Sequence, residues 1–344
     1  MKTETIKEKT YRLPGQLSQF QKEMYVHLID WKREKLGIKE PGFYNYQGLQ
    51  ISYDAILPES AIKDYPIIYP EILEPLFEHQ KYFPFKLHQH FNHMASSQAA
   101  NVNLFLPVLL SPTVNKILKE LKPDFKALDT SQLFHGFQIE YWDGQGKEKG
   151  LLGDHNARSG TDSDIAIAYK NQDGESCLWL IEHKLTETEF TTCGGAKSGN
   201  RDKSRHNCNK PLSSILLDKN SCYYHDVRKN NYWNITERHQ SFFKNHQQFH
   251  RCPFIGGLNQ LWRNQLLGLA LEDEGRYKHV FFSVVYHPGN RALENSLIAY
   301  GELVNHNPKF SAFTSDTLVD IARSQKDKSL DKWVEWYEGM YKLQ

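Results

Sequence analysis

The stretch that most constrains the fold runs from Thr161 to Glu187, where two apolar segments flank a short polar one. Residues 164–169 (DIAIAY) and 176–184 (SCLWLIEHK) are rich in apolar and β-branched side chains, as buried strands are. Between them, NQDG at 171–174 has the composition of a tight turn. The sequence therefore predicts a buried β-hairpin.

Charged side chains stand at one end of both predicted strands. Asp164 opens the first strand, and Glu182 and Lys184 close the second. Side chains two residues apart on a strand point to the same side, so Glu182 and Lys184 share a face. A turn centred on residues 172–173 pairs Asp164 with about residue 181, one step from Glu182. Two carboxylates are therefore expected side by side.

Neighbouring carboxylates repel each other, and a hard divalent cation relieves this repulsion while leaving room for water and a phosphate oxygen. Such a cation activates water and stabilises charge in phosphodiester hydrolysis. Lys184 would orient or deprotonate the attacking water and offset developing negative charge. Chance is the alternative, because the pattern Asp164, Glu182, Lys184 is short and strand ends often carry charge. The placement of all three at one end of a buried hairpin favours the catalytic interpretation.

The periodicity of apolar residues predicts further elements around the hairpin. The predicted helices are 15–36, 87–111, 113–128 with a break at Pro123, 258–274, 315–325 and 329–342. The additional predicted strands are 132–143 and 278–288. The central order is thus helix, strand, strand, strand, helix, strand.

With these residues in these places, the chain resembles the PD-(D/E)XK nuclease superfamily, whose core is αβββαβ. More narrowly, it is similar to a restriction-endonuclease-like branch of that superfamily. The segments that carry the resemblance are SSQAANVNLF (96–105), SGTDSDIAI (159–167), LIEHKLTE (180–187) and CPFIGGLNQLWRNQ (252–265). The resemblance covers roughly residues 85–290 and implies an α/β fold with a mixed central sheet.

The resemblance also implies roles for individual residues. Asp164 and Glu182 would bind Mg²⁺ or Mn²⁺, and Lys184 would be the catalytic lysine. Glu140, in the first strand, would supply a further metal-binding carboxylate; a solvated strand residue is the alternative.

The helix after the lysine departs from the family pattern. Many relatives carry Gln-x-x-x-Tyr there, whereas here Gln260 is followed by Asn264. Gln260 is expected to join the catalytic residues. Gln260, Arg263 and Asn264 share the polar face of the predicted helix and would meet DNA or the surroundings of the metal; an ordinary solvated face is the alternative.

Four of the five cysteines lie between the predicted catalytic strand and this helix. They are Cys193, Cys208, Cys222 and Cys252, whereas Cys177 sits within a strand and is expected in the core. Their spacing lacks the Cys-x-x-Cys pairs of common zinc sites. Some nuclease relatives bind an iron–sulfur cluster through four cysteines, so a [4Fe-4S] cluster or Zn²⁺ is expected here, with free thiols as the alternative.

The segment from Cys193 to Cys252 is also basic, with eleven Lys and Arg against four Asp and Glu. A local excess of positive charge is typical of a nucleic-acid contact surface. Its aromatic residues either stack on unpaired bases or form a small core.

The chain is therefore predicted to have three parts. These are a helical and irregular N-terminal extension (1–84), a nuclease core (85–310) with a basic Cys-containing insertion (188–256), and C-terminal helices (311–344). The expected function is metal-dependent DNA hydrolysis; the alternative is a non-catalytic nucleic-acid-binding protein on the same fold. The sequence shows no membrane-spanning segment and no secretory signal, and with its cysteines this predicts a cytoplasmic protein.

Overall fold

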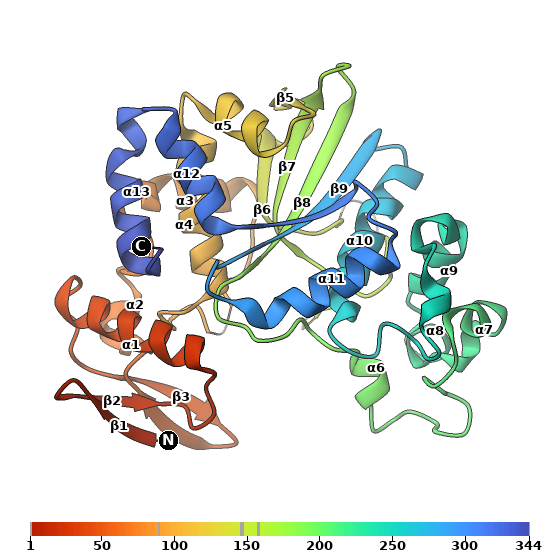
Figure 1. Cartoon of the computed structure of the whole chain (residues 1–344), viewed down its shortest axis with the longest axis horizontal. Coiled ribbons are helices and arrows are strands. Elements are labelled where there is room, and N and C mark those ends of the chain that lie inside the picture. Colours follow the sequence, from red (N-terminus) through yellow and green to blue (C-terminus); the bar gives the residue numbers. More distant parts are fainter. Residues whose placement is uncertain (1, 89, 145–147, 157–158, 344) are drawn as a thin grey trace.

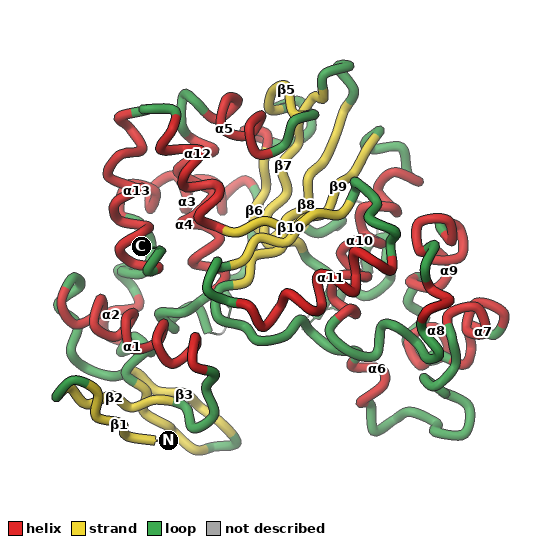
Figure 2. Tube along the Cα trace, viewed as in Figure 1, coloured by secondary structure: helices red, strands yellow, loops and turns green. Residues whose placement is uncertain are grey.

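The computed structural model describes residues 2–88, 90–144, 148–156 and 159–343. At its centre is a six-stranded mixed sheet, seen as the long yellow traces in Figure 2. The strands are β5 (Phe125–Leu128), β6 (Phe137–Tyr141), β7 (Ser163–Asn171), β8 (Ser176–Lys184), β9 (His279–Tyr286) and β10 (Phe310–Thr314). They follow the order β10-β9-β8-β7-β5, and β6 also pairs with β7. The predicted α/β fold with a mixed central sheet is confirmed.

Helices surround this sheet (Figure 1). The α-helices are α1 (Gln19–Glu34), α2 (Glu59–Ile62), α3 (Leu73–Tyr82), α4 (Ser97–Leu110), α5 (Val114–Leu121), α6 (Gly194–Lys197), α7 (Leu212–Leu217), α8 (Tyr223–Asp226), α9 (Tyr232–Arg238), α10 (Leu258–Asp273), α11 (Glu294–Leu303), α12 (Ser315–Ser324) and α13 (Lys328–Tyr341). The 3-10 helices are η1 (Pro70–Ile72), η2 (Phe134–Gly136), η3 (Lys219–Ser221), η4 (Gln240–Phe243), η5 (His246–Gln248) and η6 (Arg291–Leu293).

The predicted hairpin forms the middle of the sheet as β7 and β8. The two strands are antiparallel, and Ile165 pairs with Ile181. At the turn, the side-chain oxygen of Asn171 accepts the backbone N–H of Glu175 (2.8 Å), and Gly174 adopts a φ of 80°, which glycine tolerates best. Strand β9 runs parallel to β8, and β10 runs parallel to β9, so the sheet is mixed.

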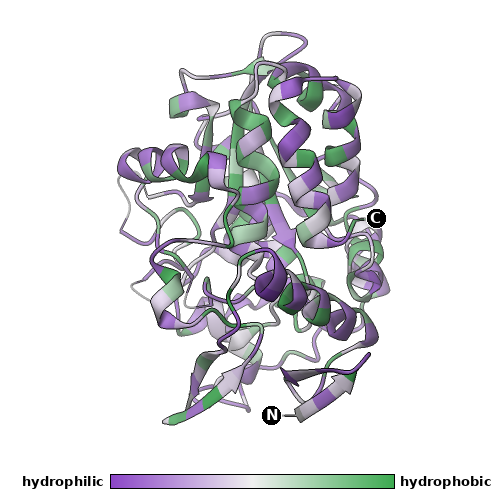
Figure 3. Ribbon diagram, turned by 90° about the vertical axis from the view of Figure 1, so that its left-hand side faces the viewer, coloured by the Kyte–Doolittle hydropathy of each residue, from purple (hydrophilic) through white to green (hydrophobic). Residues whose placement is uncertain are grey.

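The two faces of the sheet pack against different hydrophobic cores. Ile165 and Ile181 point into the core that includes α4, α12 and α13, whereas Ala166 and Leu180 point into the core that includes α10 and α11. In the hydropathy colouring of Figure 3 the helices that cover this side of the sheet mix green with purple. This two-sided burial explains why the strands read as continuous apolar runs.

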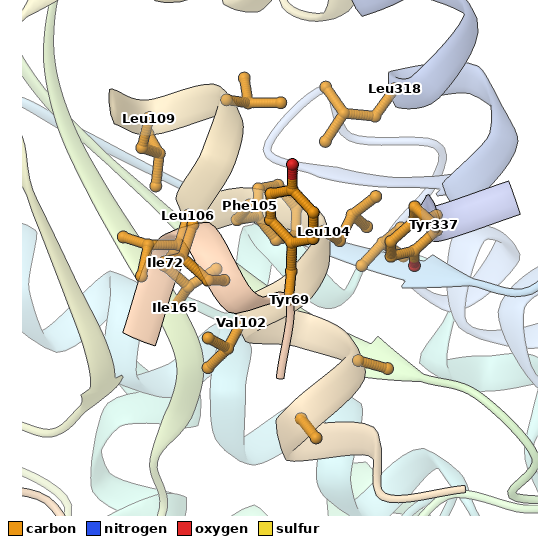
Figure 4. Close-up of a cluster of buried hydrophobic side chains, with 14 of the residues drawn as sticks. Tyr69, Ile72, Val102, Leu104, Phe105, Leu106, Leu109, Ile165, Leu318 and Tyr337 are labelled. Atoms are coloured by element: carbon orange, nitrogen blue, oxygen red, sulfur yellow. The ribbon is translucent and has the colours of Figure 1, made fainter. Parts of the chain in front are cut away.

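Helix α4 is buried on nearly all sides. It begins after Ser96, whose hydroxyl oxygen accepts the N–H of Ala99 (3.3 Å) as an N-cap. Most of its residues are apolar, as in a helix that lies inside a protein, and α4 lies between the sheet and the C-terminal helices. Figure 4 shows Val102, Leu104, Phe105, Leu106 and Leu109 of α4 near Tyr69, Ile72, Ile165, Leu318 and Tyr337.

The helix predicted over residues 87–111 is shorter than expected, because α4 starts only at Ser97. The preceding segment instead bonds to an earlier part of the chain. The N–H of Met94 donates to the Ala55 carbonyl, and the N–H of Leu57 donates to the Asn92 carbonyl (both 2.8 Å). Residue 89 of this range lies outside the described residues.

Four strands of the N-terminal region and two of the central sheet were not predicted. The N-terminal region contains two antiparallel hairpins, β1 (Lys2–Ile6) with β2 (Lys9–Leu13) and β3 (Gly42–Tyr46) with β4 (Leu49–Tyr53). In the central sheet, β5 begins two residues after the predicted break at Pro123, and β10 adds an edge strand beside β9. Both sheet additions are only four or five residues long, too short for a clear period-two pattern.

The insertion between β8 and α10 packs through its aromatic residues. Tyr223, Tyr232 and Trp233 are buried. The Trp233 ring lies 4.9 Å from that of Trp262 on α10, and Phe254 stacks on Trp262 with ring centroids 4.0 Å apart. These aromatic side chains therefore form a core instead of an exposed surface for stacking bases.

Candidate active site

Three carboxylates lie in one row across three neighbouring strands. The register in which Ile165 pairs with Ile181 puts Asp164 opposite Glu182. The antiparallel register of β6 and β7 likewise puts Glu140 opposite Asp164. The structure thus brings together the three residues expected to bind metal.

Glu182 is the most extensively hydrogen-bonded of the three. Its Oε1 accepts from Gln260 Nε2 (2.6 Å) and contacts Lys184 Nζ (2.8 Å), and its Oε2 accepts from Asn264 Nδ2 (2.9 Å). Gln260 and Asn264 are one turn apart on α10, so their side chains lie on the same side of the helix. Gln260 therefore joins the acidic residues, and Asn264, one turn further along α10, also contacts Glu182.

Asp164 lies between the two glutamates. Burial of most of its side chain, together with the nearby charges of Glu182 and Glu140, raises the pKa of Asp164 well above its usual value. Lys184 and the backbone N–H of His183 act in the opposite direction, and this N–H donates to Asp164 Oδ2 (2.6 Å). The hydrogen bond fixes the carboxyl group in place, whereas burial and the neighbouring acids disfavour its ionised form.

Glu140 occupies an irregular position in β6. Its φ of 51° is left-handed, which is uncommon for a residue other than glycine. The normal alternation of the strand breaks here, because Ile139 and Tyr141 point into the two different cores. Gln98 of α4 donates to Glu140 Oε1 (2.9 Å). The backbone distortion and Gln98 together fix the direction of the Glu140 side chain.

The acidic row is electrostatically crowded. The pKa of Glu140 is raised to about 7, first by burial and then by the charges of Asp162 and Glu182, while the hydrogen bond from Gln98 acts in the opposite direction. Lys184 is buried as well, which by itself would lower its pKa. Instead, Glu182, Glu187 and Asp164 together raise the pKa of Lys184 above its usual value. The site therefore holds one firmly protonated lysine among several acids.

The chemistry of this donor set fits a hard divalent cation, since it consists of carboxylate oxygens that repel one another. Within the described ranges, however, no group of three or more His, Cys, Asp or Glu side chains is arranged so that it could hold a metal ion. At Glu182 both oxygens already have partners, Gln260 and Lys184 at Oε1 and Asn264 at Oε2. The residue types therefore fit the cation, whereas their present arrangement is not that of a metal site.

Two polar residues of α4 were not singled out from the sequence, although both fall in the segment SSQAANVNLF. Gln98 donates to Glu140, and Asn101 Nδ2 donates to the backbone oxygen of Asp164 (2.9 Å). Both are buried in an otherwise apolar helix. Buried amides at an N-terminal helix end could have drawn attention to them, because buried polar groups need partners.

The four cysteines of the insertion gather in one region. The N–H of Cys252 donates to the Cys208 carbonyl (3.1 Å). Burial raises the pKa of the Cys252 thiol well above its usual value, and Cys222, Cys193 and Cys208 raise it further. All are free thiols, and Cys177 is buried separately in β8, as predicted. The four cysteines thus lie in one region, but within the described part of the chain they do not form a group arranged to hold a metal ion.

None of the helices in the described residues combines the length and apolar character needed to cross a membrane. No curated protein and no solved structure matches the chain. A family model described as "Restriction Endonuclease associating with ARP" (REase-ARP) matches residues 26–342. Because this match spans the sheet, the acidic row and the insertion, the chain belongs to the REase-ARP family.

Proposed function

We propose that the protein is a metal-dependent nuclease of the PD-(D/E)XK type that hydrolyses phosphodiester bonds in DNA. The observation that carries the proposal is the row of Glu140, Asp164 and Glu182 on adjacent strands, with Lys184 in contact with Glu182. The family description, which names a restriction endonuclease, supports DNA as the substrate.

Asp164, Glu182 and Glu140 are the residues that would hold Mg²⁺ or Mn²⁺. When bound, such an ion activates water for attack and offsets charge on the phosphate. The amides of Gln260 and Asn264 keep Glu182 oriented toward the row, and Gln98 does the same for Glu140.

Lys184 contributes a positive charge at this site. Its raised pKa keeps the ammonium group protonated in the arrangement seen here. A protonated lysine donates hydrogen bonds and stabilises negative charge, but it does not accept a proton. Of the two roles expected from the sequence, orienting or deprotonating the attacking water, a protonated Lys184 suits the first.

The test is a cleavage assay on linear, circular and single-stranded DNA with Mg²⁺ or Mn²⁺. The wild-type protein should cut at least one substrate, and EDTA should stop the reaction. Lys184→Ala should lower the rate at least about 100-fold, as losses of single charge-stabilising groups do. Lys170→Ala is the matched control, because Lys170 lies on the neighbouring strand β7 and pairs with Asp129 (2.9 Å).

Equal cleavage by Lys184→Ala and the wild type would refute the catalytic assignment. Binding of DNA without cleavage under every metal condition would instead favour the alternative, a non-catalytic nucleic-acid-binding protein on this fold.

We further propose that Cys193, Cys208, Cys222 and Cys252 bind a [4Fe-4S] cluster or Zn²⁺ that holds the insertion together. The support is their convergence from a span of 60 residues, and the raised thiol pKa values of Cys193, Cys222 and Cys252, which come from burial first and from neighbouring thiols second. Anaerobically purified protein should contain stoichiometric iron and sulfide or one equivalent of zinc by elemental analysis. A Cys222→Ser, Cys252→Ser double variant should lose that metal. Protein that contains neither metal would show that these residues are free thiols.

A further inference from the structure

Arg263 is a half-buried cation on α10 whose Nε is fully buried. The sequence predicts that this face of the helix meets DNA or the surroundings of the metal, but the proposed function gives Arg263 no role. It lies on α10 between Gln260 and Asn264, the two residues that bond to Glu182. Its NH1 donates to the Thr161 hydroxyl (3.3 Å), three residues before Asp164. The guanidinium group therefore faces the loop that leads into β7, while its neighbours on α10 contact Glu182 of the acidic row.

The hydrogen-bonding capacity of Arg263 is incompletely used. A guanidinium group has five N–H donors, and its Nε is buried without a hydrogen-bond partner. Among the described residues, no carboxylate forms an ion pair with Arg263. A buried charge is normally paired with an opposite charge, because burying it alone is costly. A half-buried arginine with a buried, unpartnered Nε and no ion pair thus indicates an anionic ligand.

The surroundings hold the arginine without neutralising it directly. Asp154 is close enough to favour the charged arginine, but its Oδ2 accepts from the hydroxyls of Thr161 (2.5 Å) and Tyr232 (2.7 Å). Asp154 Oδ1 is buried and has no hydrogen-bond partner. The hydroxyl groups of Thr161 and Tyr232 thus lie between Asp154 and Arg263. Their hydrogen bonds to Asp154 hold both side chains beside the guanidinium group.

We propose that Arg263 binds a backbone phosphate of the nucleic-acid strand next to the scissile position, with Thr161 and Tyr232 holding it ready. The inference rests on the proposed function, since it takes DNA as the ligand. Arginine suits this task because its planar fork can bond two phosphate oxygens at once. The rival account is a purely structural network in which Asp154 alone compensates the charge.

The experiment measures equilibrium binding of a short fluorescent DNA duplex to the full chain in EDTA, over a series of salt concentrations. Loss of one phosphate contact should reduce the slope of log K against log[salt] by about 0.9. Arg263→Gln should show this reduced slope and bind about tenfold more weakly near 0.1 M salt. Arg263→Lys should keep the slope but bind several-fold more weakly, because the charge remains and the fork is lost.

Arg33→Gln is the matched control. Arg33 is also a partly buried arginine, but it pairs with Asp54 at 2.8 Å in the N-terminal region, so its loss should leave the salt slope unchanged. Thermal unfolding of each variant separates loss of binding from loss of structure. If Arg263→Gln does not fold, Arg263→Lys decides: weaker binding at an unchanged slope supports the proposal, and wild-type affinity overturns it.

An Arg263→Gln variant that folds and binds DNA with wild-type affinity and slope would show a structural role only. This outcome is distinct from failure of the nuclease proposal, because binding in EDTA requires no catalysis. A protein that never cuts DNA but binds it through Arg263 would refute the nuclease and keep this inference. A protein that cuts DNA but binds it equally well after Arg263→Gln would support the nuclease proposal and refute the role of Arg263.

Discussion

At the scale of single residues, the candidate site contains buried polar and charged groups that are unfavourable unless neighbouring groups bond to them. Glu140 combines a left-handed backbone with a pKa raised to about 7 by burial. Strained and electrostatically shifted residues concentrate at functional sites, because the surrounding structure must hold them there. Gln98 provides that support for Glu140 through a hydrogen bond of 2.9 Å, and Gln260 and Asn264 hold the neighbouring Glu182 through bonds of 2.6 and 2.9 Å.

A second buried charge gives a testable pH dependence away from the site. Lys32 of α1 is buried and donates to the carbonyls of Glu40 (2.8 Å) and Ile56 (3.2 Å). Burial lowers its pKa from 10.5 to about 8, although Asp54 acts in the opposite direction. Between these two pH values the unfolded chain binds a proton that the folded chain has released, so folding gains stability as pH rises.

Lys32→Met should abolish this gain. Urea denaturation of both proteins from pH 7 to pH 10.5 should show the stability of the wild type increasing relative to the variant as pH rises above about 8. Parallel pH dependences of the two proteins would mean that Lys32 keeps an ordinary pKa in the folded state.

At the scale of elements, α10 connects the sheet, the acidic row and the insertion. One side of the helix presents Gln260 and Asn264 to Glu182, and Trp262 packs among the aromatic residues of the insertion. Gly268 allows close approach to β9, because a Cβ atom there would lie 3.0 Å from Val280 Cγ1. The close packing of α10 on β9 therefore determines whether the amides of Gln260 and Asn264 can contact Glu182.

Gly268→Val should push α10 away from the sheet. Overpacking of this kind costs about 1–3 kcal/mol, and the amides should lose their contact with Glu182, so DNA cleavage should fall more than about tenfold. Gly301→Ala is the control, since a Cβ atom in that position of α11 meets nothing closer than 3.7 Å. Full cleavage by a destabilised Gly268→Val protein would show that the helix position does not tune the site.

At the scale of the whole molecule, the two ends of the chain share the core on one side of the sheet. Met24 and Leu28 of α1 and Trp333 of α13 belong to the same buried cluster as α4. Asn103 of α4 joins these parts, since its Nδ2 donates to the Tyr341 hydroxyl (2.8 Å) and its backbone oxygen accepts from Trp333 Nε1 (2.7 Å). The helix that supports the acidic row thus packs directly on the C-terminal helices.

Trp333→Ala should therefore destabilise the protein as a whole. Removal of a fully buried tryptophan costs about 3–5 kcal/mol, which is a large part of the stability of a typical protein. Urea denaturation followed by tryptophan fluorescence and circular dichroism should show one transition at a lower midpoint. Trp333→Phe, which keeps most of the buried ring, should cost less. A separate early transition confined to the C-terminal helices would show that they unfold on their own.

The sequence alone determined the central hairpin and the residues at its end. Continuous apolar strands, a four-residue turn and a period of two place Asp164, Glu182 and Lys184 together by local geometry. Helices α1, α10, α12 and α13 were likewise predicted, because long amphipathic or apolar periods need no distant partner to be recognised.

Only the tertiary structure decided what depends on contacts between distant segments. The short strands β5 and β10 form because neighbouring strands offer them hydrogen bonds, and residues 92–94 leave the predicted helix to bond with 55–57. The partners of the acidic row show the same limit: Gln98 reaches Glu140 across 42 positions, and Asn264 reaches Glu182 across 82. No local pattern encodes such pairs, because their energy arises only once the sheet and helices have packed together.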